Sequence, residues 1–208
     1  MNISKFILFD VVLVIAATPL LFLIQDKNKN HTLFRRSKKK DISQKTSFKL
    51  PNKNKLIELE KLAKIQGSGI EFNALVGKWK FVSIWKKETD DEDFIFSSLL
   101  RFFSAELELK KVISKENLLE FSIITSIQFG LLSIVFSGSG YLRGKQPLLP
   151  FFFNLIELKS GSNILLSKSL NEPIENEELF FALIASDKSY GWLSARGQGG
   201  ALFLFLKD

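Results

Sequence analysis

Few side chains of this sequence are suited to catalysis. The chain contains no cysteine, so it has no thiolate nucleophile, no disulfide and no zinc thiolate. Its only histidine, His31, lies in a basic stretch with no cluster of Asp, Glu or Cys around it, and we interpret it as a solvated residue. No spacing singles out a pair of carboxylates for acid–base catalysis. We therefore predict that the protein is not an enzyme and has no catalytic residue, no bound metal and no cofactor.

Two further patterns resemble ligand-binding loops without matching them. The acidic residues 90–93 lack the alternating ligands and the glycine of a calcium-binding loop, so they favour a solvated turn that places negative charge before a helix. The glycines in residues 138–140 and 197–200 do not open helices, as nucleotide-binding turns do, and they favour tight connections between strands. Neither pattern predicts a site.

A period of two in hydrophobicity predicts strands after Gly77. In residues 78–86, Trp79, Phe81 and Trp85 share one face and lysines share the other. Residues 119–129 alternate in the same way, with apolar positions at Leu119, Phe121, Ile123, Ile127 and Phe129. Further candidate strands occupy residues 106–110, 132–136, 152–158, 164–168, 179–185, 190–195 and 201–206.

Many short strands in succession, separated by Gly, Asn, Ser or Pro, predict one antiparallel sheet. Closing that sheet into a barrel removes the exposed edges that an open sheet would leave, so we expect a mainly β fold, an antiparallel β-barrel. One or two short helices accompany it. An amphipathic helix is predicted around residues 56–63, and an apolar one, capping or flanking the barrel mouth, over residues 94–105, where one helical face carries Phe94, Leu99, Phe102 and Phe103.

The N-terminal segment 6–24 is a run of nineteen mostly apolar residues, nearly enough for a helix to cross the ~30 Å hydrocarbon core. Asp10 and Pro19 interrupt it, but the apolar neighbours outweigh the ~2–3 kcal/mol that a carboxylate costs in lipid. We predict an N-terminal transmembrane helix, an anchor over residues 1–25. The alternatives are a cleaved signal peptide, because Lys5 precedes the run, and a segment lying on the membrane surface.

Positive charge is concentrated after this segment. Residues 25–55 hold eleven Lys or Arg and two Asp or Glu, whereas residues 56–208 hold seventeen basic and nineteen acidic residues. This near-neutral remainder argues against nucleic acid as a partner. We predict a basic flexible linker over residues 26–54, solvated or attracted to anionic lipid, and a globular domain over residues 55–208. The positive-inside rule predicts a single-pass protein whose domain lies on the cytoplasmic or stromal side.

Two short motifs mark the ends of the predicted barrel. Residues 75–81 read Leu-Val-Gly-Lys-Trp-Lys-Phe, and residues 196–203 read Arg-Gly-Gln-Gly-Gly-Ala-Leu-Phe. They resemble the opening L-x-G-x-W-x-L strand and the closing R-G-x-x-G-x-L-F element of the plastid lipid-associated proteins, the fibrillin family of plastids and cyanobacteria. The likeness covers about residues 56–208. Ser83 and Ile84 replace a common Tyr-Thr pair, and Leu193 replaces an arginine, so the chain is similar to a divergent cyanobacterial-type member.

The resemblance implies a lipocalin-like barrel that binds lipids, quinones or carotenoids at photosynthetic membranes, the thylakoid or the plasma membrane. We expect Trp79 and Arg196 to meet at the barrel floor, where a guanidinium over an indole stabilises by ~1–2 kcal/mol. The alternative is that Arg196 contacts the anionic headgroup of a ligand. The motif residues expected at the floor are Gly77, Trp79, Arg196, Gly197, Gly200 and Phe203.

These features favour a protein that binds a lipid or another hydrophobic small molecule while it is tethered to a membrane. An interior filled by its own phenyl side chains is the outcome that would remove this hypothesis. One alternative is a structural or assembly factor that contacts a photosynthetic membrane complex without a ligand, and another is a barrel hydrolase or isomerase with a polar pair deep inside. The side chains predicted to line the barrel are Phe81, Trp85, Phe121, Ile123, Ile127 and Phe129.

Overall fold

The computed structural model describes residues 50–87, 91–113, 119–144, 147–171 and 178–208. They belong to one unit, from Leu50 to Asp208. The predicted anchor over residues 1–25 and nearly all of the predicted linker over residues 26–54 lie outside the described residues. Within the described part of the chain, no helix is long and apolar enough to cross a membrane.

All nine predicted strands are confirmed, and several extend beyond the hydrophobic pattern that indicated them. Each strand is antiparallel to the strands beside it. In chain order they are β1 (Gly77–Trp85), β2 (Glu106–Ile113), β3 (Leu119–Phe129), β4 (Leu132–Tyr141), β5 (Leu148–Ser160), β6 (Asn163–Ser169), β7 (Leu179–Asp187), β8 (Trp192–Gly197) and β9 (Leu202–Lys207).

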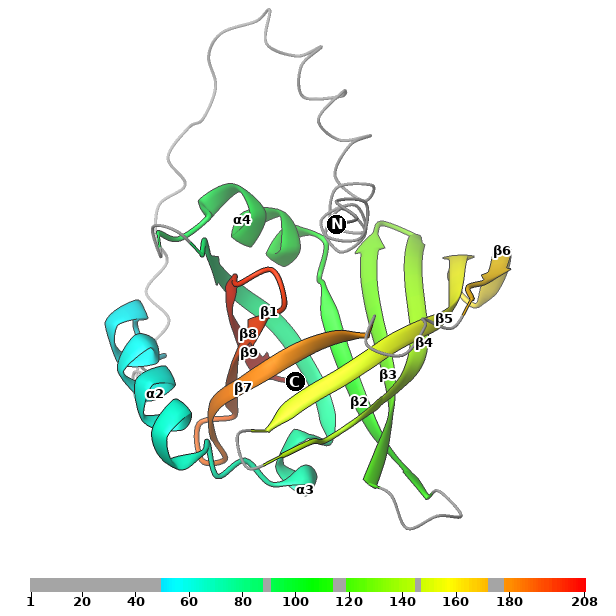
Figure 1. Ribbon diagram of the computed structural model, residues 1–208. Helices are drawn as coiled ribbons and strands as arrows, with labels where there is room; N and C mark the ends of the chain where they lie inside the picture. Colours follow the sequence, from blue (N-terminus) through cyan, green and yellow to red (C-terminus); the bar gives the residue numbers. More distant parts are fainter. Residues whose placement is uncertain (1–49, 88–90, 114–118, 145–146, 172–177) are drawn as a thin grey trace, which may run out of the picture. The chain divides into compact units, whose positions relative to one another are not determined.

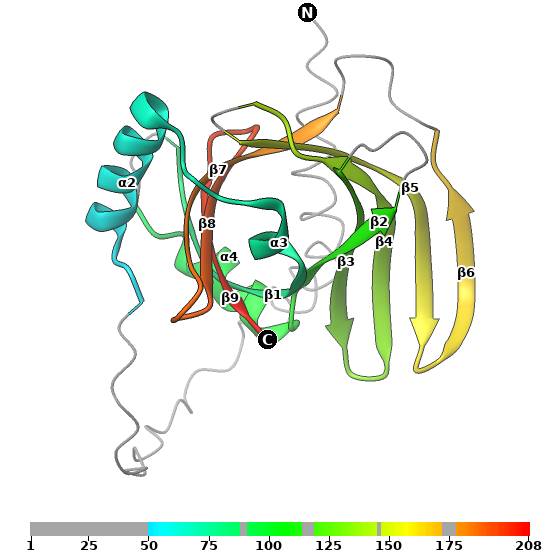
Figure 2. The ribbon, with the colours of Figure 1, turned by 90° about the horizontal axis from the view of Figure 1, so that it is seen from below.

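Eight of these strands close into a barrel-like ring (Figures 1 and 2). Hydrogen-bonded neighbours follow the order β1-β2-β3-β4-β5-β7-β8-β9, and β9 pairs back with β1. The long strand β5 allows this closure, because it pairs with β4, with β7 through Leu148–Phe151 and with β6 through Leu155–Ser160. β6 therefore lies outside the ring as an edge strand beside β5 (Figure 2).

The described residues form three helices, α2 (Lys53–Gln66), α3 (Phe72–Leu75) and α4 (Phe94–Phe102). α2 lies along the outside of the ring, α3 lies across one end and α4 lies at the other (Figures 1 and 2); we call these the α3 end and the α4 end. The helices around residues 56–63 and 94–105 were predicted. α3 was not, because four residues are too few to show a helical period.

The residues before α4 act as a helix N-terminus. The Asp93 carboxylate accepts a hydrogen bond from the backbone N–H of Phe96 at 3.1 Å and so satisfies one of the unpaired donors of the first turn. This agrees with the expectation of negative charge before a helix, although Asp90 lies outside the described residues. Within the described residues, no three His, Cys, Asp or Glu side chains gather as metal ligands would.

A bulge in β1 divides its side chains between two apolar layers. Phe81 pairs with Phe205, the register shifts after Phe81, and Trp85 pairs with Leu202. Directly paired residues share a face of an antiparallel sheet, so Phe81 faces the interior of the ring while Trp85 faces outward. The prediction that Trp79, Phe81 and Trp85 share one face is therefore wrong for Trp85, because a bulge adds one residue to the alternation.

The outer layer packs α2 against the ring. Leu56 of α2 is fully buried in a cluster whose other members come from β1, β7, β8 and β9. Because Phe203 and Phe205 point to the interior while Leu202 and Leu204 point to α2, β9 is buried on both faces, which explains its unbroken apolar sequence. The cluster around Leu56 consists of Trp85, Ile184, Trp192, Leu202 and Leu204.

We expect Leu56→Ala to lower the free energy of unfolding by about 2–5 kcal/mol, because it leaves a cavity between α2 and the ring. The measurement is urea denaturation of the detergent-solubilised chain followed by tryptophan fluorescence. Leu62→Ala is the matched control, since Leu62 lies on the same helix with 42% of its surface exposed, and its cost should stay near or below about 0.5 kcal/mol. Equal losses for the two variants would contradict the packing described.

Candidate functional site

Phenyl side chains line the interior of the ring on five strands, and we call them the phenyl lining. Neighbouring ring centroids lie between 4.6 Å and 6.1 Å apart, the range of favourable aromatic pairs. Small residues on the wall make room for them, since a Cβ on Gly197 would lie 2.9 Å from Cε2 of Phe203. The lining consists of Phe81 (β1), Phe136 (β4), Phe151 and Phe153 (β5), Phe181 (β7), and Phe203 and Phe205 (β9).

The α3 end of the ring is closed. Phe72 of α3 stacks on Phe121 of β3 with the ring centroids 4.0 Å apart, and both side chains are buried. The indole Nε1 of Trp79 donates a hydrogen bond to the carbonyl oxygen of Leu75 at 2.7 Å, which ties α3 to β1. Lys207 Nζ lies 5.2 Å from the Trp79 ring centroid. Apolar contacts and one buried hydrogen bond therefore hold α3 across this end.

Toward the α4 end the interior face becomes exposed. Phe121 and Ile123 are 0% and 1% exposed, Ile127 on the same face of β3 is half-buried, and Phe129 is 53% exposed. Leu132 of β4, which pairs with Phe129, is 41% exposed. The apolar wall thus runs from a buried position beside α3 to a solvent-accessible position at the α4 end.

Five of the six predicted lining residues face the interior. They are Phe81, Phe121, Ile123, Ile127 and Phe129. Phe121 and Ile123 are buried, Phe81 and Ile127 are half-buried, and Phe129 is exposed. Trp85 is the exception, because the β1 bulge turns it outward into the cluster under α2. The alternation in the sequence therefore predicted the inward face of β3 correctly. Among the predicted lining residues it gave the wrong face only for Trp85, which follows the bulge in β1.

The predicted meeting of Trp79 and Arg196 does not occur. Trp79 pairs with Lys207 at the end of β9, whereas Arg196 pairs with Leu202 at its start. The two residues also lie on opposite faces, since Trp79 shares a face with Phe81 and Arg196 contacts α2. The cation beside the indole is that of Lys207, and the predicted floor is made by α3 instead.

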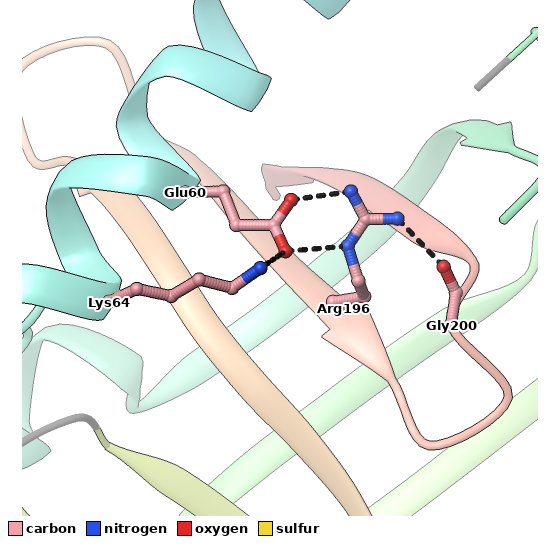
Figure 3. A network of polar contacts seen from close by, with 4 residues as sticks. All are labelled: Glu60, Lys64, Arg196 and Gly200. Carbon is pink, nitrogen blue, oxygen red and sulfur yellow. Dashed lines mark hydrogen bonds and ion pairs between the residues drawn. The ribbon is translucent and has the colours of Figure 1, made fainter.

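Arg196 instead joins α2 to the turn between β8 and β9 (Figure 3). Its Nε donates a hydrogen bond to Glu60 Oε1 at 2.9 Å, and its Nη2 donates to Glu60 Oε2. Nη1 donates to the carbonyl oxygen of Gly200 at 2.7 Å. Lys64 Nζ lies 2.9 Å from Glu60 Oε1. An anionic headgroup would have to compete with Glu60 for this guanidinium, which weakens the alternative role expected for Arg196.

Glu60 is only 7% exposed, yet it stays ionised. Burial opposes its charge, but the hydrogen bonds from Arg196 and Lys64, together with their positive charges, outweigh that effect and hold the pKa of Glu60 below its ordinary value of 4.5. A paired, hydrogen-bonded carboxylate of this kind stabilises the protein above its unfolded-state pKa. The network is therefore structural, and it lies on the outside of the ring.

The motif glycines lie at opposite ends of the ring. Gly77 begins β1 at the α3 end with φ +136°, and a Cβ there would lie 2.9 Å from Lys207 Cε. Gly197 ends β8, and Gly200 lies in the following turn with φ +88°, a backbone conformation that residues other than glycine rarely adopt. The motif residues thus shape strand ends and the turn that presents the Gly200 carbonyl to Arg196.

Comparison of the chain with protein families, curated proteins and solved structures gives no match. The likeness to plastid lipid-associated proteins therefore rests on the two motifs, and membership of that family stays a prediction. The geometry of the interior stands independently of it.

Several interior residues were not singled out from the sequence. Residues 151–153 are three consecutive phenylalanines, which carry no alternation, so their inward positions, Phe151 and Phe153, emerge only from pairing with Gly140 and Gly138. Phe72 escaped notice because α3 itself did. The one available signal was the number of phenylalanines in the candidate strands, 21 in the whole chain, which indicated an aromatic interior without assigning positions.

We expect Glu60→Gln to lower the free energy of unfolding by about 1–3 kcal/mol at neutral pH, because Arg196 loses its charged partner in a largely buried site. Because the folded-state pKa of Glu60 is depressed, its contribution is present above pH 4.5 and is lost as the pH falls through the folded-state value. The difference between the two proteins should therefore shrink in acid, as measured by urea denaturation over a pH series.

Glu58→Gln is the matched control for this measurement. Glu58 lies on the same helix with its side chain 60% exposed and pairs with Lys55. Its replacement should change stability by about 0.5 kcal/mol or less. A Glu60→Gln effect that equals this control, or that grows in acid, would contradict the assignment of the network.

Proposed function

We propose that this protein binds a lipid or another hydrophobic small molecule in a lipocalin-like barrel while it is tethered to a membrane. The proposal depends on the exposure gradient along the interior face of β3, from fully buried Phe121 beside α3 to exposed Phe129 at the α4 end. An apolar wall that is closed at one end and reaches solvent at the other offers an apolar molecule a single direction of entry. The phenyl rings of the lining pack on one another with centroids 4.6–6.1 Å apart and fill that part of the interior themselves. The ligand would therefore lie beyond them, at the α4 end.

The chemistry of the phenyl lining favours long or ring-shaped apolar ligands. Burial of a methylene group stabilises by about 0.8 kcal/mol, so about five to nineteen methylenes of an acyl chain would offset an association cost of ~4–15 kcal/mol. Aromatic faces also suit the ring of a quinone or the polyene of a carotenoid, which stack on phenyl groups. The sequence resemblance to plastid lipid-associated proteins favours the same classes and a photosynthetic membrane.

Polar groups with shifted pKa values lie on the outer face of the ring. The pKa of Lys80 is raised by its hydrogen bond to Asp208, and the pKa of Tyr141 is raised by burial and then by Glu178. Like Glu60, Lys80 and Tyr141 lie on the outer surface. Each is next to an inward-facing residue in its strand, so its own side chain points outward. This placement supports binding over acid–base catalysis in the interior.

The sequence supplies the membrane part of the proposal. Residues 6–24 are mostly apolar, and eleven basic residues against two acidic ones follow within residues 25–55. An apolar anchor and a basic linker would keep the ring close to lipid, which raises the local concentration of an apolar ligand far above its solubility in water.

The test uses photolabelling of the full chain in dodecyl maltoside with a fatty acid that carries a diazirine in its chain. We expect labelled peptides to map to β3 and β4, and we expect unlabelled fatty acid to suppress the labelling. Ile127→Glu should reduce labelling by about tenfold, because a carboxylate on the interior face removes about 1.5–3 kcal/mol of apolar burial.

Ile124→Glu is the matched control, since Ile124 is a half-buried isoleucine on the other face of the same strand. It should change labelling by about twofold or less. Equal effects of the two variants, or labelling spread over the outer surface, would refute an interior site. Reproducible crosslinks to other proteins in native membranes, with no lipid or pigment recovered from the purified chain, would favour the alternative of an assembly factor.

A further inference from the structure

The exposed face of α4 is apolar. Phe94, Ile95 and Phe102 are each 70% exposed, although an ordinary surface helix turns charged and polar residues outward. The opposite face is anchored to β1, where the Ser97 hydroxyl accepts a hydrogen bond from Ile84 N at 3.0 Å. The expectation that Phe94, Leu99, Phe102 and Phe103 share one helical face is wrong, because Phe94 and Phe102 are exposed whereas Phe103, directly after the helix, is only 7% exposed. The buried residues of α4 are Ser97 and Leu100.

The turn between β3 and β4, at the same end, and the edge strand β6 also expose apolar side chains. Leu131, in the turn between β3 and β4, is 81% exposed. Its carbonyl oxygen accepts a hydrogen bond from Gly161 N at 2.9 Å, so the β3–β4 and β5–β6 turns are joined. In the edge strand β6 that follows, three consecutive large apolar residues are more than half exposed: Ile164 (56%), Leu165 (57%) and Leu166 (63%).

Contacts connect these elements into one surface. Phe103, directly after α4, lies with its ring centroid 5.1 Å from that of Phe102 and 5.7 Å from that of Phe129. Gln128 N donates a hydrogen bond to the carbonyl oxygen of Phe103 at 2.7 Å, which fixes α4 against the end of β3. We call the exposed apolar side chains of α4, of the β3–β4 turn and of β6 the apolar rim.

We propose that the apolar rim inserts into the surface of a lipid bilayer, so that the α4 end of the ring opens onto lipid. Single exposed apolar residues are ordinary, but a connected set from three elements at one end marks an interaction surface. An edge strand that exposes apolar side chains on consecutive positions also invites aggregation unless something covers it. This inference goes beyond the proposed function, because it concerns the outer surface and does not require a ligand inside.

A bilayer fits the rim better than a protein partner does, on two counts. The same chain carries the apolar segment 6–24 and a linker of strong positive charge, both of which favour a membrane with anionic lipid. The linker joins the described domain at the start of α2, and α2 runs toward α3 (Figure 1). The chain therefore enters the domain at the end of α2 that is farther from α3, on the side of the rim.

The test places one fluorescent label at a time on the full chain. Because the sequence contains no cysteine, Leu131→Cys, Phe102→Cys and Ser189→Cys each supply a single thiol for an environment-sensitive nitrobenzoxadiazole dye. Ser189 is exposed in the turn between β7 and β8, at the α3 end, and serves as the matched position away from the rim. The labelled chains are reconstituted into vesicles of phosphatidylcholine and phosphatidylglycerol, and are quenched either by nitroxide on the lipid acyl chain or by aqueous iodide.

We expect the labels at positions 131 and 102 to be quenched by the lipid nitroxide and protected from iodide, with the reverse at position 189. Each replacement of an apolar rim residue by serine should weaken binding of the rim to the bilayer by about tenfold, because it removes an apolar side chain that would be buried in lipid. When Leu131→Ser and Leu165→Ser are combined with Phe102→Cys, the label at position 102 should therefore be quenched by iodide and no longer by the lipid nitroxide. Ile65→Ser, which alters an 85% exposed isoleucine of α2, should leave that label in lipid.

Rim labels that remain open to iodide while the chain is bound to vesicles would overturn the proposal, because the tether alone would then explain the binding. Protection that depends on the protein-to-lipid ratio, with energy transfer between labelled copies, would assign the rim to a second copy and would also overturn it. Failure of the diazirine fatty acid to label the interior, with rim labels still in lipid, would refute the proposed ligand site and leave this inference standing.

Discussion

The pairing of β1 with β9 is the interaction on which the rest of the structure depends. These strands lie about 120 residues apart in the chain, and their hydrogen bonds turn a succession of hairpins into a ring. The entropy of closing so long a segment grows only slowly with its length, so burial on both faces of β9 can offset it. Phe203 and Phe205 contribute to the phenyl lining, and Leu202 and Leu204 to the contact with α2.

Once the ring is closed, its two ends acquire different chemistry. Phe72 and the hydrogen bond from Trp79 keep α3 across one end, where side chains are buried. At the other end, α4 is anchored through Ser97 and leaves Phe94 and Phe102 in solvent. Glu60 and Arg196 lie on the outer wall, where they hold α2. The apolar side chains of the ring thus reach solvent at the α4 end.

Much of this arrangement was predictable, because alternation is a local property. The strand over residues 119–129 was identified to the residue, and its inward face was assigned correctly. The features that the sequence did not predict also have physical causes. A bulge leaves no mark in composition, so Trp85 was assigned to the wrong face. The Glu60–Arg196 pair joins residues 136 positions apart, and no spacing rule connects them. The apolar residues of α4 were wrongly placed on one face, because a short segment made almost wholly of apolar residues does not show which of them will meet the ring.

The late position of β9 in the sequence has a consequence for biosynthesis. At about 5–20 residues per second, a ribosome that has finished β1 needs roughly 6–25 s more before residues 202–207 emerge. By the end of that interval nineteen of the 21 phenylalanines have been translated, and no closed wall yet shelters them. Productive maturation would then depend on holding these segments apart until translation reaches the final strand, a task suited to a ribosome-associated chaperone.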